Sequence, residues 1–128
     1  MSFELTMLVW ALALTFVQML IAASAAALQA GVATKDEARE GVPEPKGWAG
    51  RARRAHLDMV ENMVLFVPLI LIADIAGRDN RMTEIGTELF IGSRVAYAIV
   101  ALIGIPRLPT IAWSASAASL VMIFLQLL

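Results

Sequence analysis

A long run without charge constrains this chain more than any other feature of its sequence. From Leu5 to Thr34 the chain holds no Asp, Glu, Lys or Arg. A helix needs ~20 predominantly apolar residues to cross the hydrocarbon core of a bilayer, and this run is longer than that. No basic segment precedes it, and the apolar core of a signal peptide is shorter, so we expect a retained helix that crosses a membrane.

The composition also indicates a membrane protein. Hydrophobic residues make up 59% of the chain and the mean hydropathy is +0.75, whereas a soluble domain is ~45–50% apolar. The net charge of -1 gives no reason to expect a nucleic-acid partner. The chain has no cysteine, which excludes disulfides, thiolate metal ligands and a cysteine nucleophile.

Three more apolar stretches follow the first, and together they predict helices over about 5–33, 52–76, 84–105 and 108–128. Helices are expected because a backbone exposed to lipid must satisfy its own hydrogen bonds. Thr83 is the expected cap of the third helix. We therefore predict an all-α integral membrane protein, with residues 1–128 forming a single four-transmembrane-helix bundle.

The basic residues predict an orientation in the membrane. Only Arg78 and Arg81 lie between the second and third spans. Most other basic residues lie between the first two spans or at the start of the second: Lys35, Arg39, Lys46, Arg51, Arg53 and Arg54. Because cytoplasmic loops are enriched in Lys and Arg, we expect the first connection in the cytoplasm and both termini on the non-cytoplasmic side of the cell inner membrane.

The start of the second helix carries an unusual density of polar side chains. At 100° per residue, five of them fall within a sector of about 80° and form one polar stripe, with His56 on the other side. The five are Arg51, Arg54, Asp58, Glu61 and Asn62. Arg54 and Asp58 have the spacing of an ion pair along a helix. Either the stripe is part of a functional site, or its arginines mark the headgroup boundary, where long side chains can reach water.

A second charge lies inside the third apolar stretch, at Arg94. Counted from the cytoplasmic helix ends, Glu61 and Arg94 lie at a similar depth of ~15 Å, so we expect them to pair within a subunit or across an interface. Tyr97 and Ala101 share the face of Arg94 and are candidates for a pocket wall. A purely structural ion pair is the alternative, because charges at this depth need a partner in either case.

Metal binding is not expected from this sequence. His56 is the single histidine, and the carboxylates are scattered along the chain. A zinc site needs three or four ligands in one shell, and no such set is visible.

The polar stripe and the Arg94 segment resemble the MAPEG family of membrane-associated proteins in eicosanoid and glutathione metabolism, in a bacterial-type form. The first matching motif is Arg51, Arg54-Ala55-His56 and Glu61-Asn62, followed by an apolar run with Pro68. The second is Arg94-Val95-Ala96-Tyr97, then Pro106, Thr110 and Trp113. The chain length and the long first connection also agree, so the resemblance covers nearly the whole chain.

The resemblance implies a homotrimer of four-helix subunits in membrane lipid, with glutathione as cosubstrate bound between subunits. It implies the activity of the microsomal glutathione transferases, which is conjugation of a small apolar electrophile or reduction of a lipid peroxide. By position, Arg94 and Tyr97 become the catalytic candidates. The glutathione-binding candidates become Arg51, Arg54, Asp58, Glu61, Asn62, Thr110 and Trp113.

Three positions depart from the pattern of the family's enzymes. Asp58 stands where they typically have asparagine, and Ala101 where many have tyrosine. Pro109 stands where an arginine is common, and Arg107 is displaced from that position by two residues. A thiolate needs a nearby donor or cation, so these departures leave two readings open. One is a membrane-associated glutathione transferase, and the other is a non-catalytic scaffold or accessory subunit with the same fold.

A small four-helix exporter is a third reading. It calls for an acidic residue embedded in the first helix, whereas Glu4 lies before the uncharged run.

Overall fold

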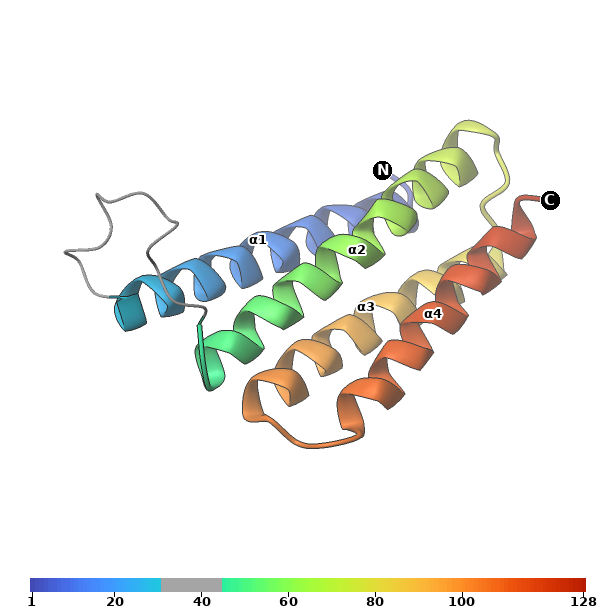
Figure 1. The fold of residues 1–128 in the computed structure, drawn as a ribbon. Helices are drawn as coiled ribbons and strands as arrows, with labels where there is room; N and C mark the ends of the chain where they lie inside the picture. The colour runs from blue at the N-terminus through green and yellow to red at the C-terminus, as the bar shows by residue number, and fades with distance from the viewer. Residues whose placement is uncertain (31–44) are drawn as a thin grey trace.

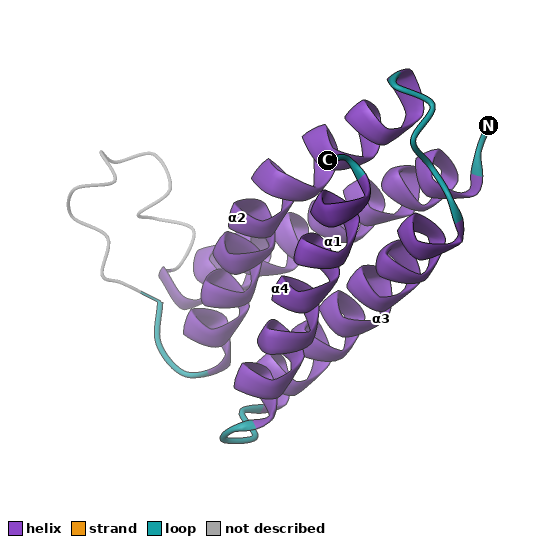
Figure 2. Cartoon of the chain, turned by 90° about the vertical axis from the view of Figure 1, so that its right-hand side faces the viewer, coloured by secondary structure: helices purple, strands orange, loops and turns teal. Residues whose placement is uncertain are grey.

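The computed structural model describes residues 1–30 and 45–128, and these contain four α-helices (Figures 1 and 2). The helices are α1 (Phe3–Ala30), α2 (Trp48–Ile75), α3 (Arg81–Ile103) and α4 (Leu108–Gln126). Residues 31–33 of the first predicted helix, together with Lys35 and Arg39, lie outside the described residues. α2 begins four residues earlier than predicted, because the helix continues through Trp48, Ala49, Gly50 and Arg51, before the predicted start at 52.

α3 also begins earlier than predicted, because Asn80 caps it and Thr83 does not. The Asn80 side chain accepts hydrogen bonds from the backbone N–H groups of Met82 and Thr83, at 2.8 and 3.0 Å. The Thr83 hydroxyl accepts from the backbone N–H of Asn80 at 2.7 Å. The two side chains therefore form a capping box, in which Thr83 is the inner partner.

A tight connection joins α3 to α4. Gly104 ends α3 in the left-handed conformation, with φ 86°, and its N–H donates to the carbonyl of Val100. Glycine suits this position because it has no Cβ to clash. Pro109 lies in the first turn of α4, where the missing N–H would have no partner within the helix. Both ends are thus set by local sequence.

Successive helices run in opposite directions (Figure 1). α1 packs chiefly on α2, and α4 packs chiefly on α3. α2 also contacts α3, which joins the two pairs into one bundle. At the end where α1 finishes, the Gln29 side chain donates to the carbonyl of Lys46 at 2.6 Å and accepts from its N–H at 3.0 Å. This reciprocal pair sets the register of α1 against the start of α2.

The core lies between the four helices. Phe66 of α2 stacks on Phe90 of α3, with ring centroids 3.9 Å apart and the planes 6° from parallel. Gly86 of α3 allows α4 to approach closely, since a Cβ at this position would lie 2.7 Å from Cγ1 of Ile123. The buried apolar residues of this core are Leu8, Ala11, Met59, Met63, Phe66, Ile70, Phe90, Leu120 and Ile123.

Three helices in the described part of the chain are long and apolar enough to cross a membrane: α1 over Phe3–Gln29, α3 and α4. This supports an integral membrane protein. The prediction of a fourth span over 52–76 is not supported in the same way, because α2 is not among the three. Its first half holds three arginines and the carboxylates Asp58 and Glu61, and such charges lower the hydropathy of a helix.

Candidate functional site

The centre of the candidate site is an ion pair between α2 and α3. Arg94 Nη2 donates to Oδ2 of Asp58 at 2.6 Å. The Arg94 side chain is fully buried, while 18% of the Asp58 side chain is exposed. A buried guanidinium needs such a partner, because an isolated charge in a low-dielectric interior is very unfavourable.

The partner of Arg94 within the chain is therefore Asp58, and the prediction of an intrachain pair with Glu61 is wrong. Glu61 follows Asp58 by three residues, which rotates its side chain by about 60° around the helix. Asp58 lies on the side of α2 that meets α3, and Glu61 is exposed. The ion pair that the spacing of Arg54 and Asp58 allows is absent among the described residues: Asp58 accepts from Arg94, and Arg54 is exposed.

Two further side chains complete this centre. Asn62 is buried, and its Nδ2 donates to the backbone carbonyl of Asp58 at 2.8 Å and lies 3.4 Å from Asp58 Oδ2. On the other side, Ser116 of α4 accepts from Arg94 Nη1 at 3.3 Å. The Ser116 hydroxyl donates in turn to the carbonyl of Trp113 at 2.9 Å. Arg94 thereby connects α3 to both α2 and α4.

The Tyr97 ring lies against the guanidinium of Arg94. Arg94 Cζ is 4.5 Å from the centroid of the Tyr97 ring, which is the geometry of a cation–π contact. Tyr97 follows Arg94 by about one helical turn toward the α3–α4 connection. The two predicted catalytic residues are thus in contact.

Tyr97 also lines a pocket of about 220 Å³ between α3 and α4. The other lining residues, all from the start of α4, are Pro109, Thr110 and Trp113. The structure therefore brings Tyr97, Thr110 and Trp113 together, as the sequence analysis expected of one site. Trp113 is 47% exposed, so the pocket has an apolar and accessible wall.

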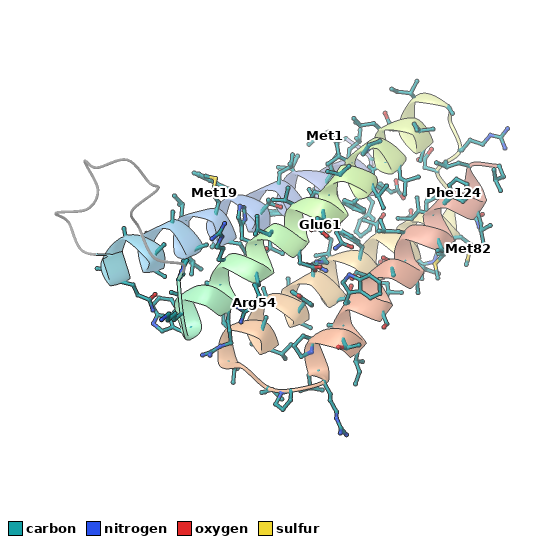
Figure 3. All side chains as sticks on the ribbon, viewed as in Figure 1. Met1, Met19, Arg54, Glu61, Met82 and Phe124 are labelled. Carbon is teal, nitrogen blue, oxygen red and sulfur yellow. The ribbon has the colours of Figure 1, made fainter. Side chains whose placement is uncertain are left out.

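The two arginines of the polar stripe, Arg51 and Arg54, differ in their contacts and exposure. Arg51 Nε donates to the carbonyl of Leu102 at 3.1 Å, so this side chain ties the start of α2 to the end of α3 beside Gly104. Arg54 and Glu61 lie along α2 and are exposed (Figure 3). The predicted single stripe is therefore divided: Asp58 and Asn62 turn into the bundle, and Arg54 and Glu61 turn outward.

No group of three histidine or carboxylate side chains that could hold a metal ion occurs in the described part of the chain. Among the described residues, neither the buried Nδ1 of His56 nor the buried Nε of Arg94 has a hydrogen-bond partner.

Comparison with known families gives one match: the model of the MAPEG family matches residues 7–128. The chain belongs to the MAPEG family. No curated protein and no solved structure matches it.

In this MAPEG protein the two motif segments meet where Asp58, which lies within the first segment, pairs with Arg94 of the second. Ser116 is the residue of this centre that the sequence analysis missed. Its only signal is a polar residue within an otherwise apolar helix, and Ser114 and Ser119 give the same signal nearby. Pro109, noted as a departure, lines the pocket itself.

Proposed function

We propose that this protein binds glutathione in a membrane, as the microsomal glutathione transferases do, and conjugates the thiol to apolar electrophiles or uses it to reduce lipid peroxides. The observation that carries the proposal is the pocket of Tyr97, Thr110 and Trp113, backed by the buried Arg94, in a chain that matches the MAPEG family over nearly its whole length.

The charges on α2 suit glutathione, which has two carboxylates and one ammonium. Arg54 is exposed and can hold a carboxylate through a bidentate pair. Glu61, also exposed, can accept from the ammonium. The thiol would enter the pocket beside Tyr97, and Trp113 would form an apolar wall for the second substrate. Arg51, Asp58 and Asn62 would support these residues through their contacts inside the bundle.

The exposed charges of α2 also favour an assembly of several copies in lipid. A charged side chain that faces hydrocarbon is unfavourable, so Arg54 and Glu61 need a polar neighbour or a ligand. A homotrimer with the site between subunits would supply one. Because α1 and α3 run in the same direction (Figure 1), we infer that α2 returns across the bilayer between them. We place the first connection in the cytoplasm and both termini outside the inner membrane.

The test uses the full-length protein in lipid nanodiscs, incubated with glutathione and a chlorinated nitrobenzene. The proposal expects conjugate to form faster than in protein-free nanodiscs, and the rate to saturate with glutathione. A Tyr97→Phe variant should lower this rate, while Arg78→Gln, in the connection between α2 and α3, should not. Absence of glutathione binding at millimolar concentration would contradict the proposal.

A non-catalytic role in the same family is the second candidate. The observation that favours it is the ion pair itself, because Asp58 neutralises Arg94, the cation beside the pocket residue Tyr97. Ala101, which stands where many of the family's enzymes have tyrosine, supplies no hydroxyl. A protein that binds glutathione without turnover, and that co-purifies with a larger membrane complex, would support a scaffold or accessory subunit.

A further inference from the structure

Both terminal nitrogens of the Arg94 guanidinium already have partners before any ligand arrives, and among the described residues its buried Nε has none. Its two terminal nitrogens bond to Asp58 and Ser116, at 2.6 and 3.3 Å, and one face lies against the Tyr97 ring. None of its side chain is exposed. It differs in this from an arginine held ready for an anion, which presents open N–H groups to its ligand.

The carboxylate that neutralises Arg94 is itself held in place. Asn62, one turn further along α2, donates to the backbone carbonyl of Asp58 and lies beside its Oδ2. A buried pair of opposite charges is neutral as a unit, and removing one partner leaves an uncompensated charge. A ligand anion would have to displace Asp58 to reach the cation.

We propose that Asp58 neutralises Arg94 and thereby makes the adjoining pocket of Tyr97, Pro109, Thr110 and Trp113 selective for an uncharged sulfur group, an un-ionised thiol or a thioether, over a thiolate or another anion. Asp58 acts here as a specificity-determining residue. This inference rests on the proposed binding of glutathione, not on its conjugation.

Other charged groups lie on both sides of the Arg94–Asp58 pair along the bundle, with Glu61 one turn further along α2 than Asp58, and they do not replace Arg94. Arg54 and Glu61 are exposed on α2, and Arg107 is exposed at the start of α4. Arg51 bonds to the carbonyl of Leu102. The pocket residues Tyr97 and Trp113 each lie about one turn from Arg94 or its partner Ser116, on the side of these cations. The arrangement fits a ligand whose carboxylates meet the exposed cations Arg54 and Arg107 while its neutral sulfur end enters the pocket.

The test compares two analogues that differ at sulfur, S-methylglutathione, which is neutral there, and glutathione sulfonate, which is anionic. Their dissociation constants are measured by calorimetry with the full-length protein in nanodiscs. The wild type should bind the S-methyl analogue at least as tightly as the sulfonate. Asp58→Asn should shift the preference toward the sulfonate by about tenfold or more, the worth of a hydrogen bond to a charged group. Asp74→Asn, the same change at an exposed site of α2, should leave the preference unchanged.

The outcomes separate this inference from the proposed function. If neither analogue binds the wild type, the proposed function fails. If both bind but the wild type prefers the sulfonate tenfold, or Asp58→Asn leaves the ratio of the two constants unchanged, the neutral-pocket inference alone is overturned. Should Asp58→Asn fail to fold, Asp58→Asn combined with Arg94→Gln removes both charges and should keep the preference for the S-methyl analogue. A preference for the sulfonate in that double variant would overturn the inference.

Discussion

Arg94 and Asp58 form a 2.6 Å ion pair that joins α3 to α2 inside an otherwise apolar bundle. Through Ser116 the same arginine reaches α4, and through Tyr97 it contacts the pocket wall. One side chain thus links packing to the candidate site, and several measurable consequences follow from its position.

Breaking the pair should destabilise the protein strongly. Arg94→Gln leaves the partly buried carboxylate of Asp58 without its cation, and breaking a buried pair typically costs ~3–5 kcal/mol. Adding Asp58→Asn should restore part of this loss, because no uncompensated charge remains. Thermal unfolding in detergent measures both effects. If Arg94→Gln unfolds like the wild type, the pair does not hold α2 to α3.

The hydroxyl of Ser116 should matter more than that of its neighbour Ser114. Ser116→Ala leaves Arg94 Nη1 buried without a partner, which costs ~1–3 kcal/mol. Ser114 is exposed, and its Oγ bonds only to the carbonyl of Thr110 within the same helix, so Ser114→Ala should change the free energy of unfolding by under ~0.5 kcal/mol. Equal effects of the two substitutions would count against the role of Ser116.

Two glycines of α3 should respond in opposite ways to alanine. At Gly86 the added Cβ would lie 2.7 Å from Ile123, so α4 must shift, and such overpacking costs ~1–3 kcal/mol. At Gly92 the added Cβ meets nothing within 4 Å, so the higher helix propensity of alanine should stabilise α3 by up to ~1 kcal/mol. Denaturation of the two variants side by side tests the close contact of α3 with α4. A loss at Gly92 that matches the loss at Gly86 would contradict it.

The capping box at the start of α3 predicts a local effect. Asn80→Ala removes the acceptor of two backbone N–H groups and should destabilise the protein by ~1 kcal/mol. Asp79→Ala, one residue earlier and exposed, is the control and should have little effect. Hydrogen exchange of the first turn of α3 should also accelerate only in the Asn80 variant. Unchanged exchange there would argue that another group caps the helix.

The sequence predicted the helical bundle well because hydrophobic runs and caps are local signals. α1, α3 and α4 follow from their apolar stretches, and the predicted ranges place the connection between α3 and α4 within two residues of its position in the structure. The sequence offers both Asn80 and Thr83 as the cap of α3, because the two residues of a capping box can each cap a helix. Only the backbone geometry shows that Asn80 is the cap and Thr83 its inner partner.

The site was harder to predict from sequence than the fold. Helical periodicity gathered Arg54, Asp58 and Glu61 on one stripe, but it could not show where α3 crosses that stripe. The prediction that Glu61 pairs with Arg94 depends on matching depth alone. Asp58 lies one turn earlier on α2 and its side chain points toward α3, so it is Asp58 that pairs with Arg94. Ser116 could not be distinguished from the other serines of α4, because its role depends on a neighbour far away in the sequence.

Equilibrium binding of glutathione to the full-length protein in nanodiscs tests the proposed function most directly, with Arg54→Gln near the start of α2 and Arg78→Gln beyond its end as matched variants. We expect saturable binding to the wild type, about tenfold weaker binding to Arg54→Gln because a charge-assisted bond is lost, and unchanged binding to Arg78→Gln. No binding to the wild type at millimolar glutathione, or equal affinities of the two variants, would contradict it.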